Sequence, residues 1–89
     1  MNLTDTRKAI DVLDNDLVAL LEKRMQLVSE VVAYKKATGK AVFDKEREEA
    51  ILAKVAARVT NKDFEEAVVA TFLDIMKQSR LYQEKQLHD

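Results

Sequence analysis

The feature that most constrains this sequence is a helical pattern that runs uninterrupted through its first third. The chain contains no proline, and its single glycine, Gly39, is the first residue expected to end a helix. Before Gly39, apolar residues recur at spacings of three and four, as on one face of a helix. They are Ile10, Leu13, Leu17, Leu20, Leu27, Val31 and Tyr34. This pattern predicts a helix from about residue 5 to about residue 37, capped by Thr4 or Asp5.

The length of this helix has a consequence for assembly. About 33 helical residues extend about 50 Å, whereas a compact domain of 89 residues is roughly 30 Å across. Because the apolar stripe continues along most of the helix, a lone chain would leave part of it in water. The simplest cover is a second copy of the chain. We therefore expect an all-α, intertwined homodimeric helical bundle.

Two shorter helices are predicted after the loop at residues 38–43. Asp44 is a plausible N-cap for a helix from Lys45 to about Arg58, and Thr60 or Asn61 for another that reaches about Leu87. The second helix has an apolar stripe, with Glu48 at its start, formed by Ile51, Leu52, Val55 and Val59. The third has a stripe that continues into two polar residues: Phe64, Val68, Phe72, Ile75, Met76, Ser79 and Gln83.

The composition excludes several kinds of function. The chain has no cysteine and a single histidine, His88, so thiolate chemistry and a multi-histidine metal site are not expected. With 15 basic and 16 acidic residues, the net charge of −1 offers no basic field for nucleic acid. No apolar run approaches the length of a membrane span, and the N-terminus lacks a secretory pattern. We expect a cytoplasmic protein.

Basic residues on apolar stripes point to an anionic ligand. The helical neighbours of Arg24 are all aliphatic, so a buried guanidinium there needs an anion from elsewhere. Lys35 follows eleven residues later, about three turns, and shares the same face at about 16 Å. Arg7 precedes Arg24 by about 25 Å along the helix, so it is expected to reach only a ligand held by a second chain.

Each of these residues also has an ordinary structural interpretation. Arg7 could form a local ion pair with Asp11, and Lys35 could extend its ammonium into water. Helix-start electrostatics or simple solvation could account for the other polar candidates. These are Asp44, Arg47, Glu48, Ser79 and Gln83.

Taken together, the set resembles the all-helical class of chorismate mutases. The similar residues are Arg7, Ile10, Leu13 and Asp14; LVALLEKR at 17–24; Val31 and Lys35; DKERE at 44–48; and SRLYQ at 79–83. They cover nearly the whole chain in order, so residues 1–89 are interpreted as a single chorismate mutase domain. The resemblance implies an isomerase that rearranges chorismate to prephenate, toward phenylalanine and tyrosine. It implies no metal and no cofactor.

The resemblance also implies roles for individual residues, in two sites each completed by the other chain. Arg24 and the second chain's Arg7 would each clamp a substrate carboxylate. Lys35 and Gln83 would donate to the ether oxygen, where negative charge develops. Glu48, assisted by Asp44, would accept a hydrogen bond from the ring hydroxyl. Arg47 would organise this carboxylate pair and lean toward a substrate carboxylate, and Ser79 would bind a carboxylate. These four cations and two carboxylates leave +2, which matches a dianionic substrate.

One position departs from the family's pattern. Relatives often carry a proline in the loop before the second helix, and Ala41 stands at that position here. A loop without this proline is less constrained, so we expect it to become ordered as substrate arrives.

Two alternative functions remain open. An isochorismate-pyruvate lyase is similar in fold and pocket, and differs mainly around Asp44 and Glu48. A non-catalytic helical dimerisation module would pair Arg24 and Lys35 with acidic residues across an interface. That second alternative predicts charge pairing without a cavity.

Overall fold

The computed structural model describes residues 2–88, and all regular structure in this range is helical. Helix α1 spans Leu3–Thr38, α2 spans Lys45–Arg58, the 3-10 turn η1 spans Lys62–Phe64, and α3 spans Glu65–His88. The prediction of an all-α chain with a long, a short and a medium helix is confirmed for the described residues. The intertwining of two chains stays a prediction.

The ends of α1 are determined by residues with specific capping chemistry. At its start the side-chain oxygen of Asn2 accepts hydrogen bonds from the backbone N–H of Thr4, at 2.8 Å, and of Asp5. The prediction that Thr4 or Asp5 caps the helix is therefore wrong, because Asn2 takes that role two residues earlier. At its end Gly39 has a φ of 72° and donates its N–H to the carbonyl of Lys35. This left-handed conformation suits glycine, which has no Cβ to clash.

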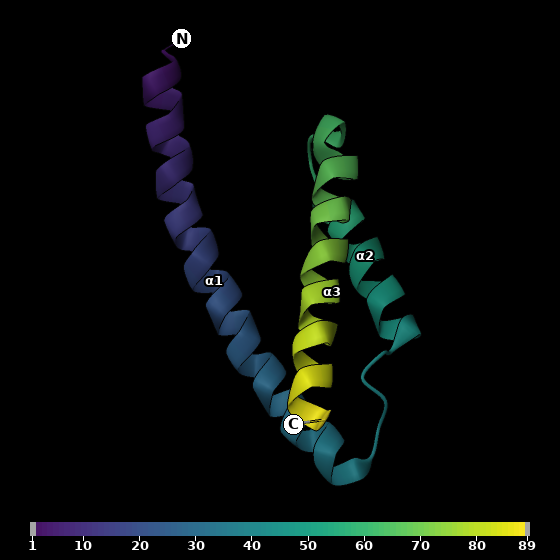
Figure 1. Cartoon of the computed structure of the whole chain (residues 1–89). Helices are drawn as coiled ribbons and strands as arrows, with labels where there is room; N and C mark the ends of the chain where they lie inside the picture. Colours follow the sequence, from purple (N-terminus) through teal and green to yellow (C-terminus); the bar gives the residue numbers. More distant parts are fainter. Residues whose placement is uncertain (1, 89) are drawn as a thin grey trace.

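Helix α3 is the central element of a long molecule, because α1 and α2 both pack on it. Figure 1 shows α2 lying beside α3, while α3 approaches only the C-terminal half of α1 and the N-terminal half extends away. A hydrogen bond of 3.1 Å between the hydroxyl groups of Ser29 and Tyr82 joins α1 to α3. The molecule measures 53 × 25 × 15 Å, so its long axis matches the length of α1.

The core is small and takes one residue each from α1, the segment before α2, α2 and α3. Its buried apolar residues are Val32, Val42, Val55 and Met76. The stripe predicted on α2 is confirmed, because Val55 is buried and the other residues of the stripe are half-buried: Ile51, Leu52 and Val59. The stripe on α3 is confirmed from Val68 onward, but Phe64 is 59% exposed. Phe64 belongs to the separate turn η1, which Asn61 caps by accepting from the N–H of Asp63.

The apolar stripe predicted on α1 is not covered within one chain. All seven of its residues are exposed, from 42% for Val31 to 63% for Leu20. The radius of gyration is 16.1 Å, larger than the roughly 12 Å of a compact chain of this length. None of the helices described here is both long and apolar enough to cross a membrane.

Candidate active site

A pocket of about 350 Å³ lies where the C-terminal half of α1, the start of α2 and the C-terminal half of α3 converge. Its volume is within the range of small-molecule sites. It is lined by seven of the eight residues that the sequence predicts for a ligand site: Arg24, Lys35, Asp44, Arg47, Glu48, Ser79 and Gln83. The helical repeat explains this convergence, since eleven residues on α1 and four on α3 each return to the same face.

Lys35 is the centre of the hydrogen bonding in the pocket. Its Nζ donates to the carbonyl oxygen of Val42 at 2.7 Å and to Oε1 of Gln83 at 2.9 Å. An ammonium group carries three N–H donors and no acceptor. Lys35 therefore keeps one N–H for a ligand. Its bond to Gln83 also orients that amide, with the oxygen facing Lys35. The solvated position considered for Lys35 is wrong, because both contacts lie within the protein.

Ser79 and Gln83 are the only buried polar side chains within residues 2–88, at 5% and 7% exposure. Nε2 of Gln83 lies 3.5 Å from Oγ of Ser79, at the outer limit of a hydrogen bond. The interpretation that this stripe has simply reached solvent is wrong. Because Lys35 occupies Oε1, the Gln83 NH₂ group is the end left to donate into the pocket.

Arg24 presents a buried donor with nothing to bind. Its Nη1 atom is buried and has no hydrogen-bond partner among residues 2–88. Leaving a buried charged donor unpaired is costly, so this geometry calls for an anion that is not part of the chain. The sequence predicted this requirement from the aliphatic neighbours of Arg24.

Glu48 is held by a residue outside the predicted set. Its Oε1 forms an ion pair with Nη1 of Arg80, on α3. The alternative that Glu48 is merely solvated is wrong, because its side chain is 18% exposed and paired with Arg80, while Lys45 pairs with Glu49. Arg80 was predictable in part, because it lies four residues after Met76 and three before Gln83 on the buried stripe. Its partner depends on how α2 approaches α3, which periodicity does not show.

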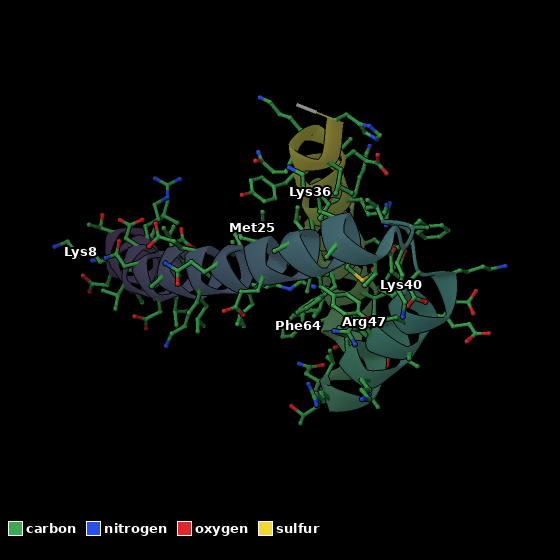
Figure 2. The ribbon with its side chains drawn as sticks, turned by 90° about the horizontal axis from the view of Figure 1, so that it is seen from below. Lys8, Met25, Lys36, Lys40, Arg47 and Phe64 are labelled. Carbon is green, nitrogen blue, oxygen red and sulfur yellow. The ribbon has the colours of Figure 1, made fainter. Side chains whose placement is uncertain are left out.

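Asp44 and Arg47 occupy the start of α2, where Asp44 is the N-cap, as predicted. Its Oδ1 accepts from the backbone N–H of Arg47 at 3.0 Å, so the Arg47 guanidinium is not used in this bond. Figure 2 shows Arg47 near Lys40. Like Arg80, Lys40 is a basic residue of the pocket that the sequence did not predict. The Lys40 Nζ lies 5.4 Å from the centre of the Tyr34 ring. Its loop position carries no periodic signal.

Arg7 is not near this pocket. It is exposed on the first turns of α1, beside Lys8, which Figure 2 shows at the opposite end of that helix. The structure contains no ion pair between Arg7 and Asp11, both of which it describes, so that alternative is wrong. Its contribution to a second chain's site stays a prediction.

The segment between α1 and α2 is anchored at one point. Val42 is 8% exposed, and its carbonyl accepts the hydrogen bond from Lys35. Burial of Val42 and its bond to Lys35 constrain the loop at the residue after Ala41, where relatives often carry a proline. Further ordering of the loop as substrate arrives stays a prediction.

Comparison with known families agrees with this geometry. The family model described as chorismate mutase type II matches residues 6–84, which is most of the chain. The chain belongs to the chorismate mutase type II family. Neither a search of curated proteins nor one of solved structures found a match. The match of the chorismate mutase type II model begins before Arg7 and ends after Gln83, so it spans every candidate site residue.

The pocket of this chorismate mutase type II chain is strongly cationic. Two carboxylates, Asp44 and Glu48, face five basic side chains, which leaves a net charge of +3. The five are Arg24, Lys35, Lys40, Arg47 and Arg80. Within residues 2–88, the structure places no three His, Asp or Glu side chains together as candidate metal ligands.

Proposed function

We propose that the chain is a chorismate mutase, which converts chorismate to prephenate by a Claisen rearrangement. The observation that carries this proposal is the buried, unpartnered Nη1 of Arg24 in the same pocket as the Lys35–Gln83 pair. A guanidinium suits bidentate binding of a carboxylate. Chorismate carries two carboxylates, and the pocket's excess of positive charge suits a dianion.

The rearrangement makes modest chemical demands on a protein. In one step the ether C–O bond breaks and a C–C bond forms, without a nucleophile or a proton transfer. The site must hold the flexible substrate in its reactive conformer and stabilise the negative charge that develops on the ether oxygen. The pocket offers two donors for that oxygen, the remaining N–H of Lys35 and the NH₂ group of Gln83.

The other pocket residues would place the rest of the substrate. Arg24 would bind one carboxylate, with Ser79 and Arg47 contacting the substrate carboxylates as well. Glu48, assisted by Asp44, would accept a hydrogen bond from the ring hydroxyl. We assign the role of organising the carboxylate pair to Arg80 and no longer to Arg47, because Arg80 holds Glu48 directly.

We further propose that the working form is an intertwined homodimer. The exposed stripe on α1 supports this, because burial of its large apolar residues by a second chain would remove them from water. Arg7 would then complete the second chain's pocket and bind the other substrate carboxylate. In this role the product leads to phenylalanine and tyrosine, and a cytoplasmic location stays a prediction.

The two alternatives are distinguishable. A non-catalytic dimerisation module does not need a pocket of about 350 Å³ with an unpartnered guanidinium. An isochorismate-pyruvate lyase would share the pocket, but the presence of both Asp44 and Glu48 favours the mutase.

A substrate comparison tests the proposal. The full chain is incubated separately with chorismate and isochorismate, without added metal or cofactor, and products are separated by chromatography. We expect prephenate from chorismate and no rapid release of pyruvate from isochorismate. Fast pyruvate release would favour the lyase, and no conversion of either substrate by folded protein would favour the non-catalytic module.

A further inference from the structure

Arg80 contacts two side chains outside its own helix, Glu48 and Phe43. Its Nη1 forms the ion pair with Oε1 of Glu48 on α2. Its guanidinium carbon also lies 5.3 Å from the centre of the Phe43 ring, in the segment before α2. The Arg80 and Glu48 side chains are 31% and 18% exposed, so this is a partly buried contact. These two contacts hold the guanidinium on two sides.

Glu48 has several cations nearby, but Arg80 is the one that pairs with it within residues 2–88. Its other nearby cations are on its own helix or across the pocket, and within residues 2–88 none but Arg80 forms an ion pair with it. Arg47 is the adjacent residue on α2, and adjacent helical residues do not face each other. Without Arg80, the largely buried Glu48 carboxylate would lack a charge partner and a fixed orientation.

We propose that Arg80 is a positioning residue for Glu48. By binding Oε1, it holds the carboxylate so that its second oxygen is directed to a hydroxyl group of the bound ligand. The cation–π contact with the Phe43 ring holds the guanidinium from a second side and so helps to keep it against Glu48. This inference rests on the proposed function, since it assigns Glu48 the substrate's ring hydroxyl.

A purely structural interpretation of Arg80 is the competing one. In it, Arg80 braces α2 against α3, and its loss weakens the fold whatever residue occupies position 48. Positioning instead acts through the Glu48 carboxylate, so removing that carboxylate must abolish the effect of Arg80. A double-mutant cycle separates the two interpretations.

The experiment measures kcat/KM on chorismate for Arg80→Met in the parent chain and in a Glu48→Gln background. We expect Arg80→Met to lower kcat/KM about 10- to 100-fold in the parent, as for loss of a charged hydrogen bond. In the Glu48→Gln background we expect a change of about two-fold or less. Arg80→Lys keeps the positive charge but not the planar guanidinium, so its kcat/KM should lie between those of the parent and Arg80→Met. Arg58→Met, on the exposed end of α2, is the matched control and should be silent.

Thermal unfolding of all four chains of the cycle accompanies the kinetics. Equal losses of kcat/KM in both backgrounds would overturn the inference in favour of a brace, even if Arg80→Met also lowered the melting temperature. An inactive parent chain would overturn the proposed function and this inference with it. An active parent with equal losses in the cycle would overturn this inference alone.

Discussion

Lys35 and Gln83 are joined across the α1–α3 contact by a hydrogen bond of 2.9 Å from Nζ to Oε1. This bond orients the Gln83 amide, and a second bond from the same Nζ to Val42 holds the segment that leads to α2. One ammonium group therefore connects α1, α3 and the segment before α2, all of which line the pocket.

Replacing Lys35 should remove more than one interaction at once. Lys35→Met deletes a donor to the ether oxygen and releases the Gln83 amide, so we expect kcat to fall by at least about 10²-fold. Steady-state kinetics with chorismate measure this loss. The matched control is Lys36→Met, an exposed neighbour outside the pocket. Similar losses in both variants would contradict the role given to Lys35.

A change at Gln83 should create a dependence on pH. In Gln83→Glu the new carboxylate can donate to the ether oxygen only when protonated, and a glutamate has an ordinary pKa of about 4.3. The Lys35 ammonium beside it favours the ionised form and moves the titration to lower pH. We therefore expect activity to rise as the pH falls toward and below about 4, where this carboxylate becomes protonated. An unchanged pH–rate profile would show that Gln83 is not a donor in the reaction.

Arg24 should lower the stability of the ligand-free protein, although the ligand needs it. Arg24→Met keeps the aliphatic volume but removes the guanidinium, whose Nη1 atom is buried without a partner. Such a replacement is often neutral or stabilising. We therefore expect a melting temperature equal to or above that of the parent, measured by circular dichroism. A drop of several degrees would mean that Arg24 is paired within the protein, which would contradict its assignment as an anion clamp.

The shared site predicts complementation between inactive chains. Arg7→Ala and Lys35→Ala chains should each be nearly inactive, but a mixed dimer would contain one site with both residues intact. With random exchange of equal amounts, about a quarter of the parental activity should return. Subunit exchange is verified by native mass spectrometry of differently tagged chains. No recovery after verified exchange would exclude a site completed by Arg7.

Most of the fold follows from local signals in the sequence. Gly39 and Asp44 mark the end of α1 and the start of α2 because each provides capping chemistry that few residues share. The N-terminal cap was misassigned because Asn2, Thr4 and Asp5 are all competent caps. Phe64 was misplaced because an Asn61 cap can begin a 3-10 turn as well as an α-helix.

The site was predictable where a polar residue interrupts an apolar stripe. Arg24, Lys35, Ser79 and Gln83 all met that criterion and all line the pocket. Arg80 did not stand out, because its partner lies 32 positions away on another helix. Pairing across helices depends on how α2 and α3 pack, and the periodic pattern of one helix does not show how it packs on another.

The most direct test compares prephenate formation by the parent chain with that by Arg24→Met. Both proteins are assayed under the same conditions with chorismate, and Arg58→Met serves as a matched exposed control. We expect rapid turnover by the parent and the control, and a loss on the order of 10²-fold or more in Arg24→Met with its fold retained. A folded parent chain that forms no prephenate, or an Arg24→Met chain as active as the parent, would contradict the proposed site.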